Sequence, residues 1–139
     1  MINRVLDLQN RTVQEITVPM HRVVTAELQT PVRELLATCR ERGFSRIPIW
    51  RLEAGVRRIA GVVGLAPLLY EGTLNLQKPA GDYLQKALFL DSRMLLDVAL
   101  RHMQRTGERL AVVRAPDQTE LGVISLEDIL KFMFGEVSL

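Results

Sequence analysis

The clearest pattern of apolar and polar positions lies in residues 28–50. Four apolar residues recur there at the spacing that places them on one helix face: Val32, Leu35, Leu36 and Cys39. Thr30 suits the N-cap of this helix and Pro31 its first position, while Gly43 suits a left-handed C-cap. The pattern therefore predicts a helix that begins at Pro31 and ends before Gly43, followed by a strand over RIPIW, residues 46–50.

The residues after this strand predict a hairpin and a short helix. A turn around Gly55 separates RIPIW from a second apolar stretch, RIAGVVGL, residues 58–65, which also favours a strand. APLLY, residues 66–70, then begins a short helix. With an extended piece before the first helix, this half of the chain is predicted to run strand, helix, strand, strand, helix.

The second half of the chain repeats this order. A shift of 64 residues places Gly107 on Gly43, and a shift of 61 residues places Gly122 on Gly61, because the second hairpin turn is three residues shorter. A repeat of about 60 residues is too long for a solenoid unit. We therefore predict an α/β fold of two β-α-β-β-α modules that share one core by pseudo-twofold packing.

Polar stretches divide the chain into a connector, two modules and a linker. We expect a connector with a short amphipathic helix at residues 1–16, a first module at 17–72, a linker rich in glycine and proline at 73–86, and a second module at 87–139. The apolar tail, residues 130–139, would be exposed in an isolated domain, so we expect it to pack on the module or on a dimer mate.

Composition and charge exclude several classes of protein. The 139 residues are 47% hydrophobic with a net charge of +2, which suits a globular core. No run of five basic residues appears, so neither nucleic-acid binding nor a membrane patch is indicated. The longest apolar run, residues 59–70, is too short to cross a bilayer and contains Pro67. The chain has no signal peptide, and Cys39 alone suggests a buried thiol in a reducing cytosol, so we expect a soluble chain.

One stretch, GVISLEDIL at residues 122–130, has two interpretations. Ser125 and Asp128 have the spacing of a capping box at the start of a helix. The same pair could hold a ribose, because an ionised carboxylate accepts hydrogen bonds from two neighbouring hydroxyls. The first copy has Gly64 and Pro67 at the matching positions, so the fold does not require the pair there.

The remaining polar residues predict no enzyme. His21 and His102 lack the spacing of a zinc site, and no nucleophile motif or glycine-rich phosphate loop is present. Glu120, Glu127 and Asp128 could hold Mg²⁺ through phosphate oxygens and water, or simply be solvated acids.

Several of these motifs together resemble a known family. The repeat, SRIPIW at residues 45–50 and GVISLEDIL are similar to a tandem pair of CBS motifs, a Bateman module. VLDLQNRTVQEITVP, residues 5–19, further resembles the connector and first motif of the CorC/HlyC/cyclin-M-type magnesium and cobalt efflux proteins. The resemblance implies a homodimer on the cytosolic side of a membrane protein, with a transmembrane domain upstream. Because the chain starts inside the connector, we expect it to be an excised fragment.

The resemblance also implies a regulatory site for an adenine nucleotide, AMP, ADP or ATP, with or without Mg²⁺. Ser125 and Asp128 would hold the ribose, and Arg46 is either the natural partner of a phosphate or simply a surface arginine on its strand. The implied nucleotide-binding residues are Val18, Pro19, Met20, Ser45, Arg46, Ile47, Ile124, Ser125, Glu127 and Asp128.

The sequence departs from the family pattern at two places. Gly64 and Pro67 offer neither hydroxyl nor carboxylate, so we expect one competent site per chain, built on the second copy. Val18 and Met20 replace the usual hydroxyl and arginine of the family, which argues against a triphosphate. The alternative function is a structural dimerisation module whose nucleotide site has degenerated.

Overall fold

The computed structural model describes residues 9–43, 45–69 and 75–134, which form two compact units. We call Val24–Ala87 the motif-1 unit, and Met1–Val23 together with Leu88–Leu139 the motif-2 unit. The amphipathic helix expected at the N-terminus falls mainly on residues 1–8, outside the described residues; Gln9 and Asn10 are helical.

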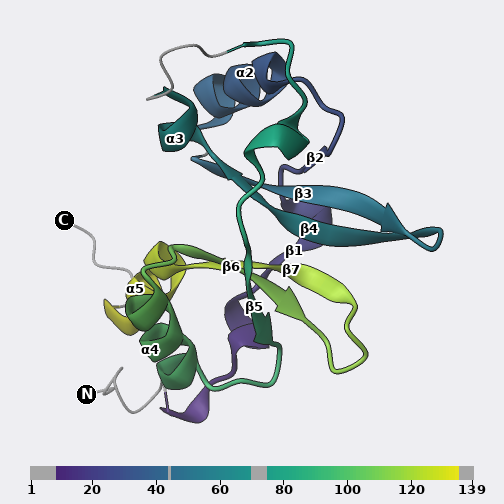
Figure 1. Ribbon diagram of the computed structural model, residues 1–139. Helices are drawn as coiled ribbons and strands as arrows, with labels where there is room; N and C mark the ends of the chain where they lie inside the picture. The colour runs from purple at the N-terminus through teal and green to yellow at the C-terminus, as the bar shows by residue number, and fades with distance from the viewer. Residues whose placement is uncertain (1–8, 44, 70–74, 135–139) are drawn as a thin grey trace. The chain divides into compact units, whose positions relative to one another are not determined.

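The motif-1 unit is a three-stranded sheet with helices on one face (Figure 1). Its sheet order is β2-β3-β4, with β2 parallel to β3 and β4 antiparallel to β3. Its elements are β2 (Ala26–Glu27), α2 (Val32–Arg42), β3 (Arg46–Glu53), β4 (Val56–Gly64), α3 (Leu65–Leu69) and the 3-10 helix η3 (Ala80–Tyr83).

The start of α2 differs from the prediction by one residue. Pro31, with φ −63° and ψ 142°, is the N-cap rather than the first helical residue. The Thr30 hydroxyl accepts a hydrogen bond from the Glu27 N–H at 3.0 Å and so does not cap the helix. Pro31 stays extended because it bridges to Pro79 in the segment after α3. The left-handed C-cap is confirmed, since Gly43 has φ 77°.

The core of the motif-1 unit joins both helices to the sheet. Its buried residues are Val32, Leu35, Cys39, Ile47, Ile49, Val63, Leu68 and Ala80. Ala80 comes from the segment expected to be a linker and is fully buried. Its N–H donates to the Thr30 carbonyl at 2.7 Å, and the Gly81 N–H donates to that of Leu28 at 2.9 Å. The described part of this segment is therefore packed against the unit.

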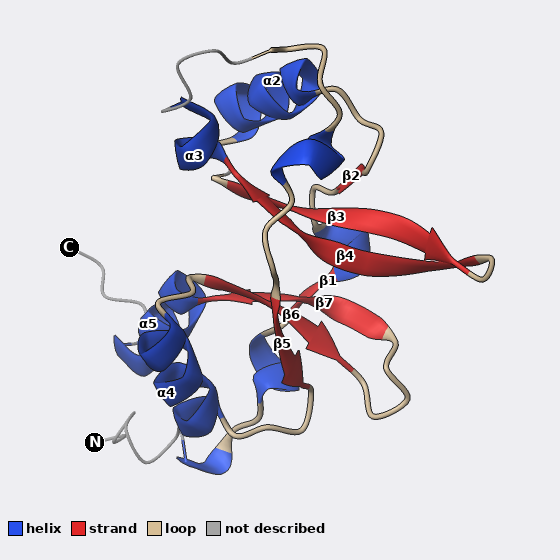
Figure 2. Cartoon of the chain, in the orientation of Figure 1, coloured by secondary structure: helices blue, strands red, loops and turns tan. Residues whose placement is uncertain are grey.

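The motif-2 unit is a four-stranded sheet, also with its two longer helices on one face (Figure 2). The sheet order is β1-β7-β6-β5, with β5 parallel to β6 and the other neighbours antiparallel. Its elements are η1 (Val13–Ile16), β1 (Val18–Pro19), η2 (Met20–Arg22), β5 (Leu88–Asp91), α4 (Leu96–Thr106), β6 (Leu110–Arg114), β7 (Glu120–Ser125) and α5 (Leu126–Phe134).

The N-terminal segment is built into the motif-2 unit. Val13 is fully buried in its core, and the Val13 N–H donates to the Met94 carbonyl at 2.8 Å. Near the other end of the chain, Phe132 and Met133 pack against the same core, as expected for the apolar tail. Phe134 is 67% exposed, and the last five residues lie outside the described part of the chain.

The predicted internal repeat and α/β fold class are confirmed. Each unit contains strand, helix, strand, strand and helix in the same order. Gly107 ends α4 with φ 76°, as Gly43 ends α2 with φ 77°. Each hairpin has a bulge at the same position, between Ile49 and Trp50 in the first copy and between Val113 and Arg114 in the second. The two copies therefore match down to local irregularities.

Candidate functional site

The capping box expected at the start of α5 is present. The Ser125 hydroxyl oxygen accepts a hydrogen bond from the Asp128 N–H at 3.0 Å. The Asp128 carboxylate accepts one from the Ser125 N–H at 3.4 Å, which is long for an N–H···O bond. The hydroxyl of Ser125 can still donate, and the carboxylate is held only loosely. The cap therefore leaves donor and acceptor capacity for a ligand.

The strand β1 lies directly beside the strand that leads into this cap. Val18 pairs with Val123 and Pro19 with Gly122 in antiparallel register. A Cβ atom on Gly122 would lie 1.9 Å from the Val18 carbonyl oxygen, so only glycine allows this approach. The glycine of GVISLEDIL therefore has a structural role, which is to admit β1.

The first copy repeats this arrangement with a different incoming segment. Val62 of β4 bridges to Gln85, and the N–H of each donates to the carbonyl of the other, at 2.9 and 2.7 Å. A Cβ atom on Gly61 would lie 2.3 Å from the Gln85 carbonyl oxygen. Each copy therefore has a glycine in its last strand that makes room for a backbone segment from outside the copy. Gly122 admits the segment that precedes the first copy, and Gly61 admits the segment that precedes the second.

The motif-2 unit contains seven of the ten predicted site residues. Val18 and Pro19 form β1, and Met20 begins η2. Of the seven residues, Ile124 is fully buried in the core, so any contact with a ligand must use its main chain. The side chains of Val18, Met20, Ser125 and Asp128 are partly exposed, and those of Pro19 and Glu127 are exposed.

The other three predicted residues lie at the start of β3 in the motif-1 unit. Ser45 is exposed and Arg46 partly exposed, while Ile47 is buried in the core. The Ser45 carbonyl accepts a hydrogen bond from the Leu65 N–H at 2.8 Å, which ties the beginning of β3 to the beginning of α3. The neighbouring strand β4 ends at Gly64, and α3 begins at the next residue, Leu65. Glycine has no side chain, so Gly64 cannot cap α3.

Sequence reasoning missed one charged contact at the start of α5. The Arg109 guanidinium donates to one Glu127 carboxylate oxygen through Nε at 3.2 Å and through Nη2 at 2.5 Å. The Arg109 carbonyl accepts the N–H of Leu126 at 2.9 Å, as Ser45 does for Leu65 in the first copy. The 64-residue shift, which places Arg109 on Ser45, is the signal that could have found it.

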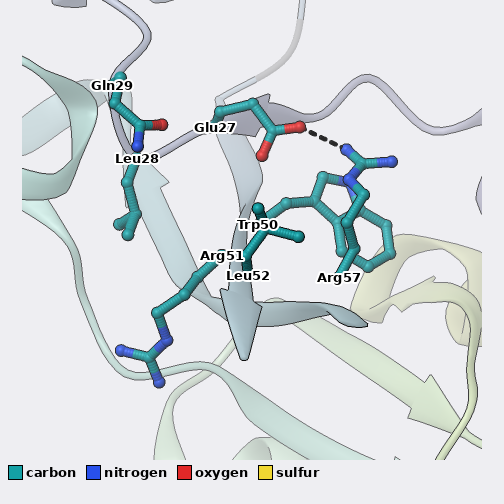
Figure 3. A pocket seen from close by; sticks show the side chains of 7 residues that line it. All are labelled: Glu27, Leu28, Gln29, Trp50, Arg51, Leu52 and Arg57. Atoms are coloured by element: carbon teal, nitrogen blue, oxygen red, sulfur yellow. Dashed lines mark hydrogen bonds and ion pairs between the residues drawn. The ribbon is translucent and has the colours of Figure 1, made fainter. Parts of the chain in front are cut away.

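A hollow of about 470 Å³ lies at the far end of β3 in the motif-1 unit (Figure 3). In it, Glu27 pairs with Arg57, whose guanidinium carbon lies 4.5 Å from the centroid of the Trp50 ring. Trp50 is buried and packs against this guanidinium. In the motif-2 unit, a different arginine–ring contact places the Arg114 guanidinium carbon 3.5 Å from the centroid of the Phe89 ring, beside a smaller hollow of about 170 Å³. None of the ten predicted nucleotide-binding residues lines either hollow.

The described residues contain no group of three or more histidine, cysteine, aspartate or glutamate side chains that could hold a metal ion. His21 is exposed and His102 partly exposed. Cys39 is 7% exposed, and burial raises the pKa of its thiol. Within the same described ranges, no helix has the length and apolar character needed to span a membrane.

Comparisons with known proteins match this fold. The CBS domain family matches residues 13–66 and again residues 80–135. The CBS domain of the bacterial CNNM/CorC family Mg²⁺ transporter is 27% identical with a TM-score of 0.85, covering 97% of this chain and 82% of that one. The same kind of domain in complex with ATP has a TM-score of 0.86 at 27% identity, covering 96% and 94%.

Curated relatives cover nearly the whole chain but are longer. Hemolysin C of Brachyspira hyodysenteriae is 25% identical over 139 residues, 99% of this chain and 50% of the relative. A UPF0053 protein of Mycobacterium bovis is 26% identical over 142 residues, 99% of this chain and 32% of the relative. The chain thus spans between about a third and a half of these two relatives. With both copies matched by the family model, the chain belongs to the CBS domain family, as a tandem pair similar to the CBS domains of the CNNM/CorC family.

Proposed function

We propose that this CBS pair binds one adenine nucleotide and regulates a membrane ion transporter to which it is joined. The observation that carries the proposal is the loosely held Ser125–Asp128 cap beside β1. A ribose offers two neighbouring hydroxyl donors, and the Asp128 carboxylate has acceptor oxygens for both. Ser125 can donate a further hydrogen bond, so the pair suits a ribose as well as a helix cap.

The rest of the proposed site follows from the family. Val18, Pro19 and Met20 would contact the base, and Ser45 and Arg46 would contact the base edge or a phosphate. Arg46 is suited to phosphate because a guanidinium forms charge-assisted, bidentate hydrogen bonds. The solved relative in complex with ATP supports an adenine nucleotide as the ligand. Any Mg²⁺ would be held through phosphate oxygens and water rather than by a protein cluster.

The proposed role is regulatory rather than catalytic. Structural neighbours of the chain are CBS domains of a Mg²⁺ transporter family, and the curated relatives extend well beyond the matched region. We therefore propose a transmembrane domain in the parent protein, a cytosolic location for this pair, and a homodimer of CBS pairs.

A structural dimerisation module with a degenerate nucleotide site is the second candidate. The first copy favours it, because Gly64 ends β4 without a hydroxyl. The uncharged Met20 favours it as well. This candidate predicts a stable dimer that binds no nucleotide.

Calorimetric titration with AMP, ADP and ATP, with and without Mg²⁺, separates the two candidates. Asp128→Asn keeps the size of the side chain but removes the charge, and should weaken binding about tenfold or more, since a hydrogen bond to a charged group contributes about 1.5–3 kcal/mol. Asp82→Asn, at an exposed carboxylate on η3, is the matched control. Thermal melting without ligand tests whether each variant is folded.

Two results would contradict the proposal in different ways. Absence of heat and of a thermal shift with every nucleotide at millimolar concentration would leave only the structural candidate. Binding that is equally strong in wild type and Asp128→Asn would refute the assignment of the ribose site while keeping nucleotide binding.

A further inference from the structure

The central strand of the motif-1 sheet runs past the end of its neighbour. β2 pairs with β3 only as far as Trp50, while β3 continues to Glu53. At the end of β2 the chain turns, and the Thr30 N–H donates to the Glu27 carbonyl at 3.1 Å. Among the residues that the structure describes, residues 51–53 of β3 therefore have no strand beside them on the side of β2.

The turn of the β3–β4 hairpin shows which main-chain groups face this open side. Ala54 and Gly55 have φ 49° and 80°, as in a two-residue type I′ turn, so the pair Glu53–Val56 that flanks the turn is hydrogen-bonded. Hydrogen-bonded and non-hydrogen-bonded pairs alternate along an antiparallel ladder. The N–H and C=O of Leu52 therefore point away from β4, toward the side that β2 leaves open.

The hollow of about 470 Å³ described above lies at this open side. Its lining includes Leu28, which follows β2, and Leu52, near the end of β3 (Figure 3). Leu52 is 70% exposed, and Val56, across the hairpin turn, is 56% exposed. The hollow therefore offers apolar contacts next to main-chain groups that could pair with a further strand.

The charge of the hairpin indicates what kind of segment could pair there. Residues 51–58 contain three arginines and one glutamate, a net charge of +2. The Arg51–Glu53 ion pair is exposed, at 47% and 51%, and such pairs are weak, so Arg51 can exchange its partner for another carboxylate. A second copy of the chain would bring the same positive charge to this edge and be repelled. The charge therefore favours an acidic segment of a different protein.

We propose that the hollow and the open edge of β3 form a docking groove for an extended acidic segment of a partner protein. The segment adds a strand beside residues 51–53 and exchanges main-chain hydrogen bonds with Leu52. Successive side chains of a strand point to opposite faces. Apolar side chains of the segment therefore lie beside Leu28 and Leu52 on one face, and its acidic side chains lie beside Arg51 on the other. This role is independent of nucleotide binding.

Titration with a peptide of eight alternating glutamate and valine residues, blocked at both ends, tests the proposal. Trp50 is the one tryptophan of the chain and lines the hollow, so its fluorescence reports binding, and calorimetry gives the affinity. Wild type should bind this peptide saturably. The same peptide with lysine in place of glutamate should bind about tenfold more weakly or worse, because its charge has the sign of the hairpin.

Two charge reversals separate the groove from general attraction. Arg51→Glu should lower the affinity for the acidic peptide about three- to tenfold, since it replaces an attraction at an exposed site by a repulsion. Arg93→Glu is the matched control, because Arg93 also forms an exposed ion pair with a carboxylate two residues away, Asp91, but in the motif-2 unit. It should change the affinity less than about twofold. Thermal melting shows whether each variant is folded.

Methylated peptides test the main-chain pairing on wild type itself. The N–H groups of alternate residues in a strand point to the same edge, so methylation of all the valine nitrogens, or of all the glutamate nitrogens, blocks one edge only. One of these two peptides should lose binding and the other should keep it. Binding of both as strong as that of the unmodified peptide, or of neither, would overturn strand addition.

The remaining outcomes also decide against the proposal. If the acidic peptide shows no saturable binding at millimolar concentration, the arginines only protect an exposed strand edge from aggregation. Equal affinities in wild type and Arg51→Glu, or equal losses in Arg51→Glu and Arg93→Glu, would mean that the groove does not recognise the acids. A change of oligomeric state in Arg51→Glu, measured by sedimentation, would make this edge an interface between copies of the chain.

Discussion

Replacement of Gly122 by alanine tests whether β1 holds the candidate site together. The added Cβ atom would lie 1.9 Å from the Val18 carbonyl oxygen, and contacts under 3.0 Å are essentially never tolerated. The strand β1 must therefore retreat by about 1.1 Å, the difference between 3.0 and 1.9 Å. Because the opposing atom is backbone, the shift strains the pairing of Val18 with Val123.

Overpacking of this kind should lower the free energy of unfolding by about 1–3 kcal/mol. For a chain of this size that corresponds to a fall of roughly 3–12 °C in the melting temperature. Gly61→Ala is the matched variant, because its Cβ atom would lie 2.3 Å from the Gln85 carbonyl oxygen in the other unit. Both variants should lose stability, but only Gly122→Ala should move the proposed base-binding residues.

Differential scanning calorimetry and nucleotide titration of the two variants give the result. Both melting temperatures should fall, and nucleotide affinity should fall markedly in Gly122→Ala and little in Gly61→Ala. If Gly122→Ala has the same melting temperature as wild type, the close approach of β1 to Gly122 is refuted. Equal affinities in both folded variants would refute the placement of the base beside Val18.

Four further predictions concern stability and protonation. Val13→Ala should destabilise the protein by about 2 kcal/mol in chemical unfolding, because two fully buried methyl groups are removed from the motif-2 core. Gly107→Ala should cost about 1 kcal/mol in the same assay, since φ is 76° there, although nothing blocks the added methyl group. The thiol of Cys39 should react with a thiol reagent at pH 8 much more slowly in the native protein than in urea. Burial raises its pKa, so stability should decline as pH rises above the ordinary value of 9.0, where the unfolded chain loses its proton first. The hydrogen bond from the Thr12 N–H has the largest effect on Glu15 and, with the one from the Arg11 side chain, lowers the pKa of its carboxyl below 4.5. The NMR titration midpoint of Glu15 should therefore lie below that value. The stability that Glu15 contributes should be lost as pH falls through the folded pKa.

Local patterns in the sequence predicted the parts of the fold that depend on neighbouring residues. The helix face of α2 and the left-handed glycine at Gly43 follow from spacing and from one residue type, and both are confirmed. The N-cap was wrong by one position because a bridge from Pro31 to the distant Pro79 keeps the backbone extended. Propensity alone cannot reveal such a bridge, since its partner lies beyond the helix and the hairpin.

The pairing of distant backbones was also beyond the sequence patterns. Nothing in the polar run around Gln85, or in the two-residue strand Val18–Pro19, shows the periodicity of a strand. The only trace is the glycine that each pairing requires, at Gly61 and Gly122. The repeat aligned these two glycines, but a matched glycine does not by itself say which backbone approaches it.

The candidate site was predicted only where the residues form a motif. Ser125 and Asp128 were identified because a capping box and a ribose clamp use the same spacing, and the structure shows the cap. Arg109 was missed because its contact with Glu127 spans 18 positions and depends on the antiparallel pairing of β6 with β7. Aligning the copies residue by residue would have shown a charge in the second that the first lacks.

The N-terminal segment and the candidate site share one folding unit, which bears on how a signal could leave the site. Val13 is anchored in the motif-2 core, and β1 pairs with the strand that ends at Ser125. The segment leading upstream is therefore hydrogen-bonded to the strand that carries the clamp, although the first copy follows it in the sequence. A ligand changes an equilibrium only by its different affinity for two states. A ligand that draws Asp128 from its cap would act at the end of β7, one strand from that segment. Coupling to the proposed upstream domain then needs no path through the motif-1 unit, so substitutions at β1 should affect it more than substitutions in α2.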